Sequence, residues 1–205
     1  MRLLTLFRLP FAAAVLVVLG AAVAGDPWLI ALGLAAAAFV YTLGRDPVRS
    51  VPSHPLGIVS PVDGRVTRID ETRDPFLDRD VLAMRIEQGL FMPAILCSPT
   101  EGRVEQIWSG PAVAALEPGG RLAVQLRTDE GDEVVFVVGR AAGIPGPLRW
   151  SVQPGERVGQ GQRRGLAGWG RPVTVYLPGG STPAVQSGAA VQAGADLVCR
   201  LVHAG

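Results

Sequence analysis

The chain has 205 residues, enough for one ordinary domain together with a small additional segment. Its formal net charge at pH 7 is +1, and this near balance of charge argues against a nucleic-acid-binding protein. All 19 basic residues are arginine, which excludes biotinyl and lipoyl carriers, because those proteins attach their cofactor to a lysine.

Two uncharged apolar runs occupy the N-terminal part of the chain, at residues 9–25 and 27–44. Each is 17 or 18 residues long, close to the lower limit of about 17–25 residues for a membrane-spanning helix. Asp26 and Pro27 form a turn between them, and arginines flank both outer ends. These features predict a transmembrane α-hairpin over residues 1–45 with both ends in the cytoplasm, because positive residues stay on that side. The rest of the chain would then face the cytoplasm at the inner membrane.

Two other interpretations of this segment remain open. The basic first residues, the apolar stretch and the Ala-Val-Ala sequence before Gly25 are also typical of a secretory signal peptide with its cleavage site. The second apolar run would still stop transfer, which argues against simple secretion. A buried pair of soluble helices is disfavoured, because both runs are apolar all round rather than along one stripe.

After residue 50 the pattern changes to short apolar runs separated by proline and glycine. Leu82, Met84 and Ile86 alternate with other residues, which places them on one face of a strand. Residues 121–139 predict a β-hairpin whose turn is Asp-Glu-Gly-Asp at 129–132. No long amphipathic helix is predicted in this part of the chain.

Two patterns recur within the β domain that we expect over residues 57–205, after a Pro-rich linker at 46–56. One is Ser-Pro-x-Asp/Glu-Gly-Arg-Val, and the other is Val-Gln-x-Gly-x-x-Val-x-x-Gly, which is typical of strands and glycine turns in barrel-sandwich folds. The repeated segments are 60–66 with 98–104, and 152–161 with 185–194. The expected fold class is therefore an N-terminal transmembrane α-hairpin followed by a β-rich, barrel-sandwich-like domain with internal repeats.

The two cysteines, Cys97 and Cys199, do not have the spacing of a metal knuckle or a redox pair. They could meet in space, but we expect two buried free thiols. No metal site is predicted.

The order of motifs resembles the phosphatidylserine decarboxylase family in its short bacterial and archaeal form. The likeness covers nearly the whole chain and is most specific at the Ser-Pro-x-Asp-Gly element and around the family's self-cleavage site. The similar segments are 44–52 (GRDPVRSVP), 58–69 (IVSPVDGRVTRI), 98–108 (SPTEGRVEQIW), 152–178 (VQPGERVGQGQRRGLAGWGRPVTVYLP) and 185–198 (VQSGAAVQAGADLV).

This resemblance implies a particular chemistry. The family's proenzyme attacks its own Gly-Ser bond with the serine hydroxyl, and β-elimination then leaves a pyruvoyl group on the C-terminal fragment. The pyruvoyl carbonyl forms a Schiff base with the amine of phosphatidylserine and accepts electrons as CO₂ leaves. Self-cleavage uses a Ser-His-Asp arrangement to activate the serine.

This sequence keeps only part of that arrangement. Asp63 occupies the position of the family's Asp, although Asp-Gly is also ordinary turn chemistry. The family's His lies in a segment Asp-Val-His-Val-Asn-Arg, which corresponds here to residues 91–97, and these contain no His, Asp or Arg. The two histidines of the chain, His54 and His203, lie elsewhere, and we expect both at the surface.

The serine position is altered as well. The family reads Phe-Gly-Ser-Arg before the strand that ends Tyr-Leu-Pro, whereas Trp169-Gly170-Arg171-Pro172 precedes that strand here. Arg171 therefore stands where the nucleophile belongs, and a guanidinium cannot eliminate to a pyruvoyl group. Gly180-Ser181 has the letters of a cleavage motif but lies after the strand, and its glycines and prolines predict a turn. The family's Asn-Glu-Arg motif is reduced to Gly119-Gly120-Arg121.

Three functions are compatible with these observations. The first is a membrane-anchored family member that has lost self-processing, carries no cofactor, and acts by binding membrane phospholipid or by regulating an active family homologue. The second is an active decarboxylase cut at Gly180-Ser181, with a self-derived pyruvoyl group and His54 or His203 as the base. The third is a periplasmic adaptor of the membrane-fusion type, although such adaptors carry a long helical hairpin that the sequence lacks.

Overall fold

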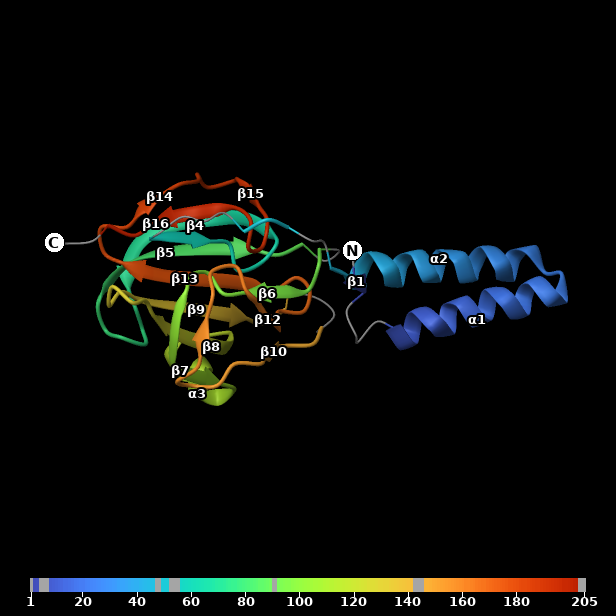
Figure 1. The fold of residues 1–205 in the computed structure, drawn as a ribbon, viewed down its shortest axis with the longest axis horizontal. Helices are drawn as coiled ribbons and strands as arrows, with labels where there is room; N and C mark the ends of the chain where they lie inside the picture. Colours follow the sequence, from blue (N-terminus) through green and yellow to red (C-terminus); the bar gives the residue numbers. More distant parts are fainter. Residues whose placement is uncertain are drawn as a thin grey trace. The chain divides into compact units, whose positions relative to one another are not determined.

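The computed structural model describes residues 2–3, 8–46, 49–51, 56–89, 92–141 and 146–202 (Figure 1). The chain forms two compact units. The first unit contains helices α1 (Arg8–Ala24) and α2 (Pro27–Gly44) and the paired strands β1 (Arg2–Leu3) and β2 (Arg45–Asp46). The second unit contains the other described strands and the short helix α3 (Pro111–Leu116).

The two helices of the first unit pack closely around a tight turn. Asp26 Oδ1 accepts hydrogen bonds from the backbone N–H groups of Trp28 and Leu29 at 2.9 and 3.2 Å, so Asp26 caps the start of α2. A Cβ atom at Gly33 would lie 2.6 Å from a methyl group of Val18, which shows how near the two helices approach. The turn expected between the apolar runs is therefore present.

The transmembrane hairpin expected over residues 1–45 is wrong. Among the helices of the described ranges, none meets the combined requirements of length and apolar character for crossing a membrane. Helix α1 has 17 residues and α2 has 18. At about 1.5 Å per residue these helices span about 26–27 Å, less than the hydrocarbon layer of about 30 Å.

One large antiparallel sheet dominates the second unit and curves into a half-barrel, with two three-stranded sheets beside it (Figure 1). In order across the large sheet, its strands are β11 (Arg157–Val158), β7 (Gly102–Ser109), β8 (Gly120–Arg127), β9 (Glu133–Gly139), β13 (Pro172–Pro178), β5 (Asp80–Glu87), β4 (Gly64–Arg73) and β15 (Ala190–Val191). The small sheets are β10 (Arg149–Trp150), β12 (Arg163–Leu166) and β6 (Ile95–Cys97), and β14 (Thr182–Pro183), β16 (Leu197–Arg200) and β3 (Gly57–Val59). The half-barrel replaces the barrel sandwich that we expected.

The predicted strand alternation is confirmed. Leu82, Met84 and Ile86 lie in the main hydrophobic core, between the large sheet and the small sheets. Val81 and Ala83 point to the opposite face of the sheet and join a second apolar cluster. Side chains of helix α3 and of the β4–β5 connection cover that second face, so the central strands are buried on both sides.

The predicted hairpin is also present, formed by β8 and β9. Its turn is closed by a 2.8 Å hydrogen bond from the N–H of Thr128 to the carbonyl of Asp132, and Gly131 takes a φ of 91° within it. Phe136 of β9 is fully buried in the main core and packs edge-on against Trp150. Strand β9 of this hairpin pairs with one edge of β13 in the large sheet.

The two internal repeats occupy equivalent places in the fold. Ser60 and Ser98 each donate a 2.7 Å hydrogen bond from Oγ to the carbonyl two residues later. The N–H of Gly194 donates to the Ser60 carbonyl at 2.8 Å, and that of Gly161 donates to the Ser98 carbonyl at the same distance. The repeated sequence therefore encodes a repeated backbone arrangement, and the glycines and valines serve turns and core as expected.

Candidate functional site

Asp63 lies in the turn of the first repeat and is almost completely buried. Arg49 forms a two-pronged ion pair with its carboxylate: Nη1 contacts Oδ1, and Nη2 contacts Oδ2 at 2.9 Å. The backbone N–H of Ala193 donates to Oδ1 at 2.7 Å, and Arg49 also donates to the Ala193 carbonyl at 3.2 Å. Asp63 therefore ties together the start of the domain and its last repeat.

In a Ser-His-Asp arrangement, the carboxylate accepts a hydrogen bond from an imidazole. Here both carboxylate oxygens of Asp63 accept from Arg49, and one also accepts from the Ala193 N–H. Burial by itself would lower the pKa of Arg49, but the hydrogen bond and negative charge of Asp63 outweigh it and raise that pKa. Arg49 is therefore held in its charged form. His54 and His203, the two candidate bases, lie outside the described residues. The second repeat has Glu101 at the place of Asp63, and that residue is exposed.

The segment that corresponds to the family's His motif lies beside the strand leading to Arg171. Strand β6 pairs with β12, with Cys97 opposite Arg163 and Ile95 opposite Leu166. Just beyond them, the N–H of Ala167 donates to the carbonyl of Ala94 at 2.9 Å. Residues 94–97 are all buried and are apolar or a thiol, so this part of the segment offers no imidazole or carboxylate as a base.

Arg171 lies immediately before β13, with only 7% of its surface exposed. Its Nη1 donates to the carbonyl of Gly139 and its Nη2 to the carbonyl of Gly146, each at 3.1 Å. Gly168 and Gly170 take φ values of 72° and 59°, and a Cβ atom at Gly168 would lie 2.9 Å from Arg171 Nε. The glycines shape the backbone turn that lets this guanidinium lie inside the protein.

Ser181 lies beyond the opposite end of the same strand. Strand β13 pairs with β5 from Pro172 to Pro178 and also with β9 from Val173 to Tyr176. Because strand register is fixed on both sides, Ser181 cannot take the place of Arg171 without breaking both ladders. The structure therefore does not bring Asp63, Arg171 and Ser181 together as one catalytic group.

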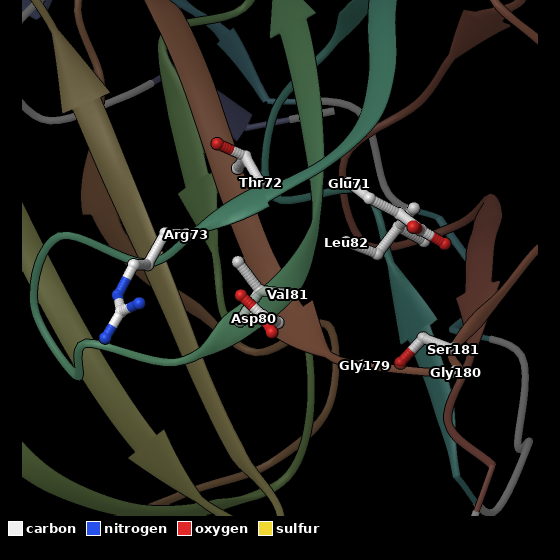
Figure 2. Close-up of a pocket in the computed structure, with 9 residues that line it drawn as sticks. All are labelled: Glu71, Thr72, Arg73, Asp80, Val81, Leu82, Gly179, Gly180 and Ser181. Atoms are coloured by element: carbon white, nitrogen blue, oxygen red, sulfur yellow. The ribbon is translucent and has the colours of Figure 1, made fainter.

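Ser181 contributes to a pocket of about 490 Å³ that opens between the ends of β4, β5 and β13 (Figure 2). Its Oγ donates a 2.6 Å hydrogen bond to the carbonyl of Pro178, and its N–H bonds to the same carbonyl at 3.2 Å. Gly180 has a φ of 84°, as a turn glycine does. The pocket residues are Glu71, Thr72, Arg73, Asp80, Val81, Leu82, Gly179, Gly180 and Ser181. The predicted turn is present, and the serine hydroxyl stabilises it.

A polar pair that the sequence did not reveal lies on the second face of the large sheet. The hydroxyl of Tyr176 donates to Glu117 Oε2 at 3.2 Å. Burial raises the pKa of Glu117, and the hydrogen bond from Tyr176 only partly offsets this. Burial, together with the charge of Glu117, also raises the pKa of Tyr176.

Cys97 and Cys199 are buried free thiols, as expected. The Cys199 Sγ donates to the Thr182 carbonyl at 3.1 Å, and burial raises the pKa of this thiol to about 11. A protonated thiol at neutral pH is a poor nucleophile, so Cys199 acts as a core residue.

Two arginines near these positions were missed as site residues. Arg49 lies in the segment 44–52 and flanks the second apolar run, and Arg121 lies in the segment 119–121. The only usable signal was that each belongs to a segment resembling a family motif. Arg49 contacts Asp63 and Ala193, which lie far from it in the chain, and a local pattern cannot predict such contacts.

Comparison with curated proteins identifies the class: the relatives are proenzymes of phospholipid metabolism. The phosphatidylserine decarboxylase proenzyme of Aromatoleum aromaticum is 36% identical over 171 residues, which cover 80% of this chain and 79% of the relative. That of Nitrosomonas europaea is 35% identical over 175 residues, covering 81% and 77%, and that of Ralstonia nicotianae is 34% identical over 171 residues, covering 80% and 79%. The chain belongs to the phosphatidylserine decarboxylase family. No family model matches it.

The family implies a pyruvoyl group, and the residues at its expected position do not fit one. The residue after Gly170 must be a serine for self-cleavage to leave a pyruvoyl cap, but Arg171 has no hydroxyl group. Ser181 has the hydroxyl, but it lies at the other end of β13 and bonds to its own turn.

Proposed function

We propose that this protein is a family member that remains one uncut chain, does not decarboxylate, and acts by binding phospholipid. The observation that carries the proposal is the buried Arg171 at the position of the self-processing serine. Its guanidinium is held by the carbonyls of Gly139 and Gly146, so it is part of the folded structure.

The surroundings of Arg171 support the same conclusion. Residues 94–97, beside the strand that leads to it, carry no carboxylate or imidazole. Asp63 is held by Arg49 and the Ala193 N–H, so its carboxylate already has strong donors. Without the serine, and with the family's Asp in a structural ion pair, general-base activation of a self-cleavage step has no group to act on.

The expected partners are phospholipid and, for a regulatory role, an active homologue of the same family. The family's connection with phospholipid metabolism favours the lipid as the first partner to test. The expected location at the inner membrane followed from the transmembrane hairpin and is therefore not part of this proposal.

The test is an activity assay on the purified full chain with phosphatidylserine vesicles. We expect no phosphatidylethanolamine above the level of vesicles alone, while the Aromatoleum aromaticum relative, run in parallel, serves as the active control. Phosphatidylethanolamine formed in proportion to the amount of this protein would contradict the proposal.

A second candidate is an active decarboxylase cut at Gly180-Ser181. The observation that favours it is that Ser181 lines a pocket together with the carboxylates of Glu71 and Asp80 (Figure 2). It requires chains 1–180 and 181–205, and it requires Ser181→Ala to abolish both cutting and phosphatidylethanolamine formation. The periplasmic adaptor is not retained as a candidate, because the chain belongs to a decarboxylase family.

A further inference from the structure

Arg171 is a buried cation with no anionic partner among the residues that the structure describes. Two of the five N–H groups of its guanidinium bond to the carbonyls of Gly139 and Gly146. Its Nε is buried and makes no hydrogen bond. None of the ion pairs within the described ranges includes it. A buried charge of this kind is costly unless a counter-charge is supplied.

A second guanidinium, that of Arg121, adds to this positive charge. Gly120, its neighbour in β8, pairs with Gly139, the residue whose carbonyl accepts from Arg171. Burial and, second, the charge of Arg121 lower the pKa of Arg171. Arg121 itself is exposed, so it can reach a ligand from the solvent side.

The carboxylates of Glu87 and Glu117 have other contacts. Glu87 stands opposite Pro172 in the ladder, but its carboxylate is turned to Arg85 at 3.5 Å. Glu117 accepts a hydrogen bond from Tyr176. No ion pair within the described ranges includes Arg171 or Arg121.

We propose that Arg171 and Arg121 form a binding site for the carboxylate or phosphate group of a phospholipid headgroup. This inference rests on the proposed function and names the group by which the lipid is held. Three of the five N–H groups of Arg171 make no hydrogen bond within the described ranges, and the buried Nε–H is one of them. A planar guanidinium suits the two oxygens of a carboxylate or phosphate better than an ammonium does.

The two carbonyl bonds of Arg171 give the site its rigidity. They hold the guanidinium at the end of β13, which is paired on both sides. A preorganised cation loses less freedom when a ligand binds than a mobile surface arginine does. The position that holds the reactive group in the family would here hold an anion of the substrate-like lipid.

The experiment measures binding to the purified full chain by titration calorimetry. The probes are glycerophosphoserine, which carries a carboxylate and a phosphate, and inorganic phosphate, which stands for a free anion. We expect Arg171→Met to weaken binding at least about tenfold and Arg121→Met to weaken it by about threefold, because bonds to charged groups are strong when buried and weaker when exposed. Arg68→Met is the matched control, since Arg68 is an exposed strand arginine paired with Asp70, and we expect no change.

Each outcome has a defined meaning. Tighter binding of glycerophosphoserine than of phosphate, weakened in both test variants, supports a headgroup site, whereas equal binding of the two supports a site for free anions. No binding of either probe, or equal binding by the unaltered protein and by a folded Arg121→Met variant, overturns the inference. The intact mass of the same sample separates the two proposals. Two fragments contradict the proposed function, whereas a single uncut chain that binds no anion contradicts this inference alone.

Discussion

At the scale of single residues, identical positions in the family and in this chain have different physical roles. Asp63 is kept, but Arg49 and the Ala193 N–H surround its carboxylate, so it acts as a buried tie. At the position of the family's processing serine, a guanidinium replaces the hydroxyl. Arg171 therefore introduces a positive charge where the family has a neutral nucleophile. The sequence predicted that Arg171 replaces the serine. It did not predict that Arg171 is buried or that its guanidinium bonds to two backbone carbonyls.

We expect Asp63→Ala to lower the free energy of unfolding by about 3 kcal/mol, because it leaves the half-buried Arg49 without its counter-charge. Glu101→Ala is the control, since Glu101 holds the equivalent place in the other repeat but is exposed, and we expect a change within about 0.5 kcal/mol. Urea unfolding of both variants measures the difference. Equal effects of the two substitutions would show that the ion pair between Arg49 and Asp63 does not stabilise the domain.

The Glu117 carboxyl gives a pH-dependent prediction. Burial raises its pKa in the folded state above the ordinary value of 4.5, so its contribution to stability is present at lower pH and is lost as pH rises through that range. We expect the stability of Glu117→Gln relative to the unaltered protein to increase between about pH 4 and pH 7, because a Gln side chain can still accept from Tyr176 without carrying a charge. Thermal unfolding across this range provides the measurement, and a relative stability that is flat or falls would contradict it.

At the scale of elements, the repeated glycines determine how the two halves of the domain meet. Gly161 and Gly194 have φ values of 66° and 67°, and a Cβ atom at Gly161 would lie 2.9 Å from the Gly194 carbonyl oxygen. The repeats and the strand alternation could be predicted from the sequence, because both are periodic. Composition alone could not predict whether the apolar helices cross a membrane, since helix length also matters.

We expect Gly161→Ala to lower the free energy of unfolding by more than about 2 kcal/mol, because it adds a backbone clash to an unfavourable positive φ. Gly131→Ala is the matched control: its φ is 91°, but no atom lies within 4 Å of the added Cβ. That control should cost only about 1 kcal/mol. Chemical unfolding compares them, and equal losses would argue against close contact between the repeats.

At the scale of the whole molecule, the chain belongs to the phosphatidylserine decarboxylase family, and Arg171 stands where the resemblance places the processing serine. Strand β13 is paired on both sides and carries Arg171 at one end and Ser181 at the other, so the fold separates the two candidate positions. Family membership could be predicted from motif order, and the relatives confirm it. The Arg49–Asp63 pair could not be predicted, because it depends on how the start of the domain meets residue 193.

The measurement that tests the central claim most directly is the intact mass of the purified protein under denaturing conditions. A single species of 21.5 kDa, corresponding to all 205 residues and carrying no pyruvoyl group, is the predicted result. Fragments 1–170 and 171–205, or 1–180 and 181–205, would contradict it. The second pair of fragments would in addition make Ser181 the processing residue.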